Sequence, residues 1–277
     1  MQVFSDTACA LGEGPLWHPE RSELFWFDIL GKTLYRKGKT EEFWGFDEHV
    51  SAAGWVDRDR LLIASETALW KFDVTTGEQE FLVGLESDNP VTRSNDGRAD
   101  PYGGFWIGTM GKAAEPFAGA IYRYHRGRLE KLFDKITVSN SICFSPDGKT
   151  AYFTDTFTRR IQRVELDDAG WPVGSPEVFV DLRPEGLNPD GSVVDALGNL
   201  WNAQWEASRV ACYASDGAFL RAVGVPASQT TCPAFGGSDM KTLFVTSAAQ
   251  DVDEAQGGMT FVTELDVMGQ CEYQVIL

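Results

Sequence analysis

Short apolar segments separated by turn residues recur along the whole chain. Leu24–Phe27, Ala151–Thr154 and Thr242–Val245 are rich in aromatic and β-branched residues. They are bounded by turns such as Pro146–Gly148 and Leu197–Asn199, which supply the positive-φ positions that a tight hairpin requires. Stripes with the period of a helix are hard to find. The pattern therefore predicts an all-β protein built from short strands.

The segments are also organised into six repeats. Each repeat has an apolar segment that starts at a small-residue turn, then a charged turn, then further apolar segments. Their spacing of about 40 to 50 residues is the period expected of a four-stranded propeller blade. We therefore predict a six-bladed β-propeller with four-stranded antiparallel blades. The repeats begin at Gly14, Ala52, Asp96, Asn140, Asp190 and Pro233.

The two ends of the chain predict how the ring closes. Gln2–Phe4 and Tyr273–Leu277 both resemble strands, and neither has a blade of its own. We expect them to share one blade, because closure of the ring would remove the exposed edges of an open sheet. With no linker or composition break, residues 1–277 are expected to form a single domain. The alternative fold is a pair of β-sandwiches, which the six-fold spacing disfavours.

Composition narrows the classes of partner. The 277 residues include 43% hydrophobic residues, and no apolar run approaches the roughly 20 residues of a membrane span. A formal charge of −17 argues against nucleic-acid binding, which depends on clustered Lys and Arg. The N-terminus has neither the positive nor the apolar region of a secretion signal. We therefore expect a cytoplasmic protein, a monomer or weak homo-oligomer, that binds small molecules and neither nucleic acid nor membranes.

Several kinds of active site find no support. The five cysteines are scattered, contain no CxxC pair and are expected to be buried, reduced thiols. The three histidines, His18, His49 and His125, lie in dissimilar contexts. The strained GxSxG turn of a serine hydrolase is absent, as are a P-loop and a GxGxxG motif that follows a strand. Nucleophilic serine catalysis and nucleotide cofactors are thus disfavoured.

Polar residues recur where each repeat leads into its first strand. The stretch Thr92–Met110 is predicted to be a polar loop followed by the strand Phe105–Ile107. In a propeller, such loops meet at one mouth of the central channel. The oxygen-bearing side chains among these residues suit a hard divalent cation, Ca²⁺, Mg²⁺ or Mn²⁺. The candidate residues are Glu13, Arg93, Asn95, Asn140 and Asp190.

Each candidate also has a purely structural interpretation. Glu13 is equally well an exposed turn acid, Asn140 a turn former, Asp190 the first residue of a hairpin turn and Arg93 a solvated loop cation. Their equivalent places in separate repeats favour a shared site. Asp96 and Asp100 are expected only to shape the turn and the start of the next strand.

Five segments resemble the gluconolactonase and regucalcin family, also called the senescence marker protein family. They are LGEGPLW, RSNDGRADPYGGFWIGTM, SNSICFSPDGKTAYFTDT, PDGSVVDALGNLW and CPAFGGSDMKTLFVTSA, in the family's order and over nearly the whole chain. The resemblance implies a six-bladed propeller that hydrolyses sugar lactones at one divalent metal, with Ca²⁺ expected first and Zn²⁺, Mg²⁺, Mn²⁺ or Fe²⁺ as alternatives.

The resemblance also implies roles for individual residues. Glu13, Asn140 and Asp190 are similar to the family's metal ligands, with Asp190 also the general base. Arg93 and Asn95 are similar to its substrate-binding pair, and a further acidic contact corresponds, by a looser match, to Glu115. The chain departs from the family after Asn140, where Ser-Ile replaces the frequent Gly-Leu. Because glycine has the wider backbone freedom, the path of the chain there is open.

Two other functions remain compatible with the same resemblance. Some members of the family are calcium-binding regulatory proteins without catalytic activity, and others hydrolyse organophosphates at the same metal. Arg93 and Asn95 favour the lactonase, because a metal sensor has no need of residues that orient a sugar. The sugar, its ring size and the physiological metal stay open.

Overall fold

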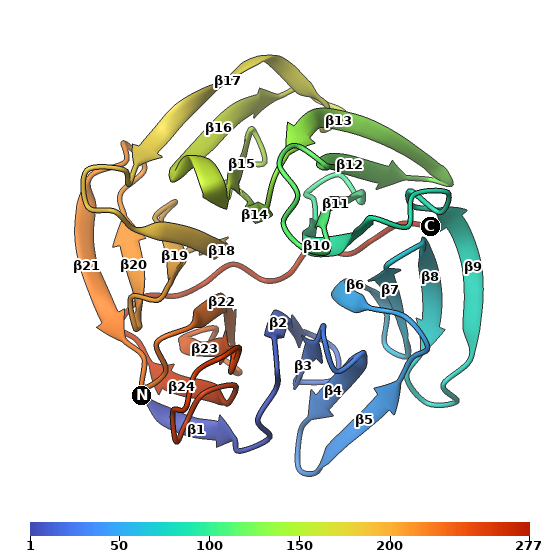
Figure 1. Ribbon diagram of the computed structural model, residues 1–277, viewed down its shortest axis with the longest axis horizontal. Coiled ribbons are helices and arrows are strands. Elements are labelled where there is room, and N and C mark those ends of the chain that lie inside the picture. Colours follow the sequence, from blue (N-terminus) through green and yellow to red (C-terminus); the bar gives the residue numbers. More distant parts are fainter.

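The repeats form six antiparallel sheets of four strands, arranged as blades around a common axis (Figure 1). The computed structural model describes all residues 1–277. The predicted six-bladed propeller is therefore confirmed. Blade 1 contains β2 (Gly12–His18), β3 (Glu23–Asp28), β4 (Thr33–Lys37) and β5 (Glu41–Gly45). Blade 2 contains β6 (Val50–Asp57), β7 (Arg60–Ser65), β8 (Ala68–Asp73) and β9 (Gln79–Gly84). Blade 3 contains β10 (Thr92–Ala99), β11 (Phe105–Gly111), β12 (Gly119–His125) and β13 (Arg128–Ile136).

The remaining blades follow in chain order, and the last is composite. Its outermost strand comes from the N-terminus, which closes the ring. Blade 4 contains β14 (Ser139–Phe144), β15 (Thr150–Asp155), β16 (Arg160–Leu166) and β17 (Pro172–Asp181), with the short helix η1 (Thr156–Thr158) after β15. Blade 5 contains β18 (Asn188–Val194), β19 (Leu200–Trp205), β20 (Arg209–Tyr213) and β21 (Phe219–Gly224). Blade 6 contains β22 (Thr230–Gly236), β23 (Thr242–Ser247), β24 (Thr260–Glu264) and β1 (Gln2–Ser5).

The ring closes, as predicted, by pairing of the N-terminal strand with a strand near the C-terminus, but this strand is not the predicted one. β1 pairs antiparallel with β24, and Gln2 lies opposite Val262. The residues Tyr273–Leu277, which were predicted to pair with β1, form no strand, so this part of the prediction is wrong. Their apolar alternation serves another purpose: Val275 is buried beneath the ends of inner strands instead of in a blade.

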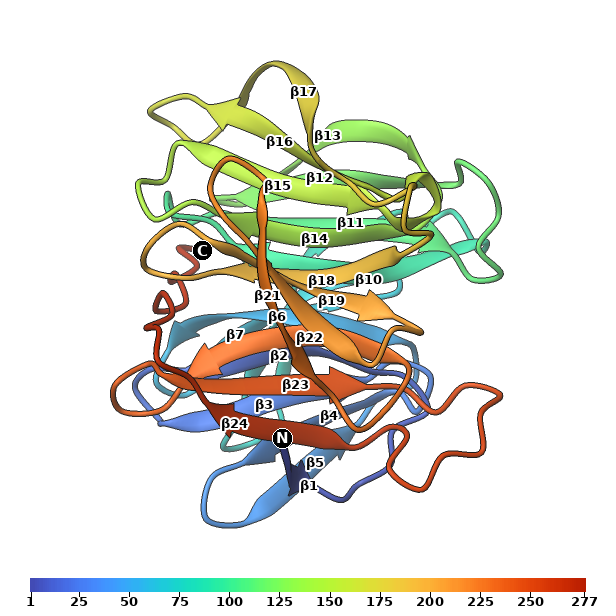
Figure 2. The same cartoon turned by 90° about the vertical axis from the view of Figure 1, so that its left-hand side faces the viewer.

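The C-terminal stretch, residues 266–277, covers one end of the ring, which we call the far face. It crosses behind the centre in Figure 1 and follows one side of the ring in Figure 2. Gln270 donates to the carbonyls of Phe144 and Val194, where β14 and β18 end. The backbone N–H of Val275 donates to the carbonyl of Trp55 in β6. The far face is therefore closed by the chain itself, whereas the inner strands begin at the opposite end, the site face.

The hydrophobic core consists of six clusters, one between each pair of neighbouring blades. Phe25 and Phe27 of blade 1, for example, pack against Leu61 and Ile63 of blade 2. A fully buried apolar side chain of this size contributes about 1.5 to 3 kcal/mol. Because apolar packing holds the blades side by side, the inner strands are free to direct polar side chains toward the axis.

The first strand of the third repeat corrects the predicted loop. Thr92–Ala99, expected to be an irregular loop, is the inner strand β10, and only Asp100–Gly104 forms the turn into β11. Its polar side chains suggested a loop because one face of this strand points to the axis instead of into apolar packing.

The prediction that the cysteines are buried, free thiols is mostly confirmed. All five thiols are free and four are buried, but Cys271 is exposed on the C-terminal stretch.

Candidate functional site

An irregularity in each inner strand places the candidate residues. All six inner strands shift register against the second strand of their blade, starting in the first half of the inner strand. Glu13 and Asn140 are the last paired residues before such a shift, whereas Asn95 and Asp190 lie inside one. A β-bulge leaves residues out of the ladder and re-aims their side chains. In blades 1, 3, 4 and 5, a residue at or inside this bulge lines the cavity at the site face: Glu13, Asn95, Asn140 and Asp190.

These side chains line one cavity of about 310 Å³ at the site face. Five of the six predicted site residues are among its lining residues, although they come from four different blades. The cavity is lined by Leu11, Glu13, Arg93, Asn95, Met110, Ala114, Val138, Asn140, Thr156, Asp190, Trp205 and Gln250.

Two buried carboxyl groups face each other in this cavity. Glu13 and Asp190 are 6% and 5% exposed. Burial, followed by the charge of Asp96, raises the pKa of Glu13 to about 8. Burial, followed by the charge of Glu13, raises the pKa of Asp190 well above its usual value. Ionising both carboxyl groups at once is therefore unfavourable unless a cation lies between them.

The hydrogen bonds of this pair are incomplete. Glu13 Oε2 accepts one bond, from the backbone N–H of Gly14 at 3.0 Å. Asp190 Oδ1 is buried and has no hydrogen-bond partner when both carboxyls are ionised, whereas a proton on either one would let Glu13 and Asp190 hydrogen-bond to each other. Because buried polar atoms are normally paired, an orphaned carboxylate oxygen points to a ligand that would complete it.

Asn140 supplies the third oxygen. Its Nδ2 donates to the Thr156 hydroxyl at 2.9 Å, so its Oδ1 faces the opposite way, where it accepts from Asn95 Nδ2 at 3.1 Å. The Thr156 hydroxyl in turn donates to the carbonyl of Pro189 at 2.7 Å. This chain fixes the orientation of the carboxamide and leaves the second lone pair of its oxygen available on the cavity side.

The set fits a hard divalent cation. No three His, Cys, Asp or Glu side chains are grouped anywhere as a metal cluster. The donor set is instead two carboxylates and one carboxamide oxygen, which together balance a charge of +2 and leave positions for water. The orphaned Asp190 oxygen and the unneutralised carboxylate pair are the observations that support this fit.

Arg93 lies beside the carboxylates as a buried cation. Its Nη1 donates to the Asn95 Oδ1 at 2.7 Å and to the Ser94 carbonyl at 2.8 Å. Burial lowers the pKa of Arg93 to about 10, although the charges of Glu13, Glu66 and Asp190 oppose that shift. Its other N–H groups make no hydrogen bond within the protein. The guanidinium is thus positioned by Asn95 and still has donors to offer.

Asp96 and Asp100 have different roles, although both were expected to shape turns. Asp100 does so, because its Oδ1 accepts from the backbone N–H groups of Tyr102 and Gly104. Asp96 is buried in the bulge of β10, and its Oδ2 accepts from the backbone N–H of Ile142 in blade 4 at 2.7 Å. Burial raises the pKa of Asp96 to about 6. It therefore joins two blades beneath the cavity.

Glu115 lies on the loop between β11 and β12 and is not among the cavity-lining residues. Its Oε2 accepts from the backbone N–H of Ala113 at 3.1 Å. Its neighbour Ala114 does line the cavity. The expected contact between Glu115 and a substrate stays a prediction.

Sequence reasoning missed four residues that share one topological place. Antiparallel second strands end at the face where inner strands begin, so residues at or just after those ends also line the cavity. Searching each repeat at the end of its second strand would have found them. They are Met110, Thr156, Trp205 and Gln250, from the third, fourth, fifth and sixth blades.

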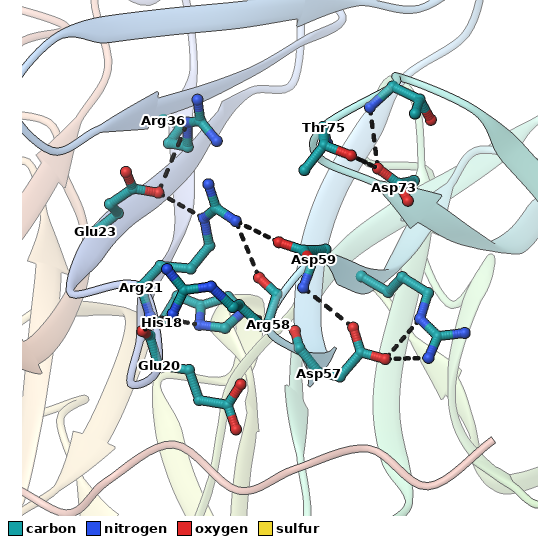
Figure 3. Close-up of polar contacts among 12 residues, drawn as sticks. His18, Glu20, Arg21, Glu23, Arg36, Asp57, Arg58, Asp59, Asp73 and Thr75 are labelled. Carbon is teal, nitrogen blue, oxygen red and sulfur yellow. Dashed lines mark hydrogen bonds and ion pairs between the residues drawn. The ribbon is translucent and has the colours of Figure 1, made fainter.

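The three histidines lie outside the cavity. His18 ends β2 at the far face, fully buried, where its Nε2 lies 3.0 Å from the carbonyl of Asp57 in blade 2. Around it, Arg21 bridges Glu23 and Asp59, so this cluster joins blades 1 and 2 (Figure 3). His49 contacts Glu66 through Nδ1 at 2.6 Å, and His125 packs against Trp171.

Comparisons with known proteins show the family and similar folds. The sequence model described as "SMP-30/Gluconolactonase/LRE-like region" matches residues 11–249. A crystal structure of a calcium-binding protein, regucalcin, from Agrobacterium tumefaciens superposes with a TM-score of 0.97 at 42% identity, covering 100% of this chain and 97% of that one.

Two similar curated proteins carry more specific names. An L-arabinolactonase from Azospirillum brasilense is 36% identical over 95% of this chain and 91% of its own length. Pentonolactonase XacC from Haloferax volcanii is 33% identical over 91% of this chain and 86% of its own length. Both are sugar lactonases by name, and both names refer to lactones of five-carbon sugars.

Proposed function

The chain belongs to the SMP-30/gluconolactonase/LRE-like family, and we propose that it is a sugar lactonase that hydrolyses an aldonolactone to the aldonic acid. One observation carries this proposal. Arg93 and Asn95 are hydrogen-bonded to each other inside the cavity that holds Glu13, Asn140 and Asp190. A protein that only bound a metal ion would have no use for a buried, preorganised donor pair beside the ion.

Glu13, Asn140 and Asp190 would hold one divalent cation, with Ca²⁺ the first expectation for a set of oxygen ligands. When bound, such an ion acts as a Lewis acid that polarises the lactone carbonyl. The ion would also relieve the repulsion that raises the pKa of Glu13 and Asp190. Because oxygen ligands admit several ions, Mg²⁺, Mn²⁺, Zn²⁺ and Fe²⁺ are further candidates.

Asp190 would accept the proton of the attacking water. Asp190 lines the cavity, and its Oδ1 accepts no hydrogen bond from the protein. General-base catalysis of this kind contributes about 10² to 10⁴ in rate. A bound cation would favour the ionised form of Asp190, whose pKa is raised by burial and by the charge of Glu13, and the ionised carboxylate can take a proton from water.

Arg93 and Asn95 would orient the sugar. The free N–H groups of Arg93 donate in a planar fork that matches paired hydroxyl or carbonyl oxygens. Met110 and Trp205 add apolar surface to the same cavity. A volume of about 310 Å³ is at the small end of ligand sites, which suits a single sugar ring.

The test is an indicator assay of acid release from a panel of five- and six-membered aldonolactones. The protein is first stripped with a chelator and then reloaded with single metals. We expect turnover that disappears with chelation and returns with at least one divalent ion. Ca²⁺ binding without turnover on any lactone would instead identify a non-catalytic calcium-binding propeller.

A further inference from the structure

Ser141 occupies a backbone position that favours glycine. It follows Asn140 in the bulge of β14, is fully buried and has φ of 60°. The matching residue in blade 1, after Glu13, is Gly14 with φ of 55°. Residues with a side chain adopt this left-handed region only at a cost, whereas glycine adopts it freely. The same backbone requirement is thus met by glycine in one blade and by serine in another.

The Ser141 side chain is engaged by its neighbours in blade 5. Its hydroxyl donates to the backbone carbonyl of Asp190 at 2.5 Å. It accepts from the Ser192 hydroxyl at 3.0 Å and lies 3.2 Å from Asn202 Nδ2. Asn202 Nδ2 also donates to the Asp190 carbonyl at 3.1 Å. Ser141 therefore belongs to a buried cluster of hydroxyl and amide groups around a single carbonyl.

That carbonyl belongs to a residue that the ladder does not hold. Asp190 lies inside the bulge of β18, between the paired residues Pro189 and Ser192. On its other side the chain is tightly packed, since a Cβ added to Gly191 would lie 2.3 Å from the sulfur of Cys232. With the Cys232 side fixed by packing, the hydrogen bonds from Ser141 and Asn202 to the carbonyl set the tilt of the peptide and so the direction of the Asp190 carboxylate; the bond from Ser141 is the shorter and the one that comes from the neighbouring blade.

We propose that Ser141 is a positioning residue that holds the Asp190 carboxylate in register with Asn140 through its hydrogen bond to the Asp190 carbonyl. The inference rests on the proposed function, in which both neighbours are ligands of one cation. This role explains why the position holds a serine with a strained backbone. Glycine would adopt the same φ without strain, but it has no hydroxyl to form the hydrogen bond between blade 4 and blade 5.

Two substitutions separate strain from the hydrogen bond. Ser141→Ala removes the hydroxyl and keeps the strain, whereas Ser141→Gly removes both. Hydrogen-bonding partners just outside a metal's ligands typically change metal affinity or activity by about 10- to 100-fold when mutated. We expect both variants to lose about that much in Ca²⁺ affinity, measured by calorimetry on metal-free protein, and in kcat. The alanine variant should be less thermally stable than the glycine variant, because alanine keeps the backbone strain and glycine removes it.

Ser139→Ala is the matched control, because Ser139 is buried in the same strand and its hydroxyl has no hydrogen-bond partner. It should retain Ca²⁺ affinity and kcat. Wild-type Ca²⁺ affinity in Ser141→Gly would overturn the positioning role. The calorimetric measurement requires no turnover, so a lack of lactonase activity in the wild-type protein would reject the proposed function while leaving the effect of Ser141 on Ca²⁺ binding measurable.

Discussion

Asn95 donates a hydrogen bond from Nδ2 to Asn140 Oδ1, 3.1 Å away, across the boundary between the third and fourth blades. The bond joins the proposed substrate-binding pair to the proposed metal ligands. On one side, Asn95 accepts from Arg93; on the other, Asn140 donates to Thr156. Sugar binding and cation binding are therefore expected to depend on each other, because both use groups in the same chain of hydrogen bonds.

Asn95→Ala tests this dependence. The substitution removes the acceptor of Arg93 and the donor to Asn140 together. We expect KM to rise and metal affinity to fall, each by about tenfold or more, because both neighbours lose the partner that orients them. Steady-state kinetics at several metal concentrations measures both effects. Asn199→Ala, in the hairpin between β18 and β19, is the control, and unchanged metal affinity in Asn95→Ala would contradict the coupling.

The Glu13 and Asp190 pair predicts an unusual pH dependence of stability in the metal-free protein. The folded-state pKa of Glu13 is raised from 4.5 to about 8, so the folded protein binds more protons than the unfolded chain between these values. Stability must then fall as pH rises from about 4.5 to 8. The raised pKa of Asp96, about 6, acts in the same direction.

The measurement is the melting temperature from pH 5 to 8, with chelator and with Ca²⁺. We expect a decline with rising pH in chelator and a much smaller decline in Ca²⁺, since the bound ion stabilises the ionised carboxylates. Glu13→Gln should flatten the decline in chelator and raise the melting temperature at pH 8. A metal-free protein that gains stability over this range would show that the two carboxyls do not oppose each other as described.

The repeats and the strands were predictable because both follow from local patterns. Turn residues and short apolar runs mark each hairpin, and their period marks each blade. Glu13, Asn140 and Asp190 were found because equivalent positions in a closed ring must converge. The resemblance to a known family added the roles that we propose for them.

The errors came where the tertiary structure decides. Asp96 precedes a glycine and so suggests a turn, but it lies in a bulge whose existence depends on pairing with β11. Thr92–Ala99 looked irregular because the side chains that this strand directs toward the axis are polar, so the segment lacks the apolar pattern of a strand in a core. Tyr273–Leu277 has the alternation of a strand, yet it packs under strand ends. In each case the partner surface is supplied by residues far away in sequence.

The ion pair of Arg98 and Glu272 holds the C-terminal stretch against the far face. Their side chains are 11% and 7% exposed. Glu272→Gln would leave Arg98 as a buried, unpaired cation, so we expect a loss of about 3 to 5 kcal/mol in the free energy of unfolding. Glu177→Gln breaks the exposed pair with Arg163 and should cost at most about 1 kcal/mol. Urea denaturation of the two variants compares them, and equal costs would show that the pair of Arg98 and Glu272 adds no more stability than an exposed ion pair.

Asp190→Asn separates the two roles proposed for Asp190. An asparagine keeps an oxygen that can bind the cation, but it cannot accept a proton from water. We therefore expect Ca²⁺ binding to survive in weakened form while kcat falls by about 10² to 10⁴ even at saturating metal. Arg93→Ala should behave in the opposite way, with KM raised more than kcat is lowered, because it removes donors to the sugar and no metal ligand.

Asp147→Asn provides the control for this pair. Asp147 precedes a glycine, as Asp190 does, but lies in an exposed hairpin turn on the far face, where it accepts from the Ser145 hydroxyl. Its substitution should leave kcat and KM unchanged. Full activity in Asp190→Asn at saturating metal would remove Asp190 as the base. Full activity in Asp190→Ala would remove it as a ligand as well, because alanine offers neither an oxygen to the cation nor an acceptor for the proton.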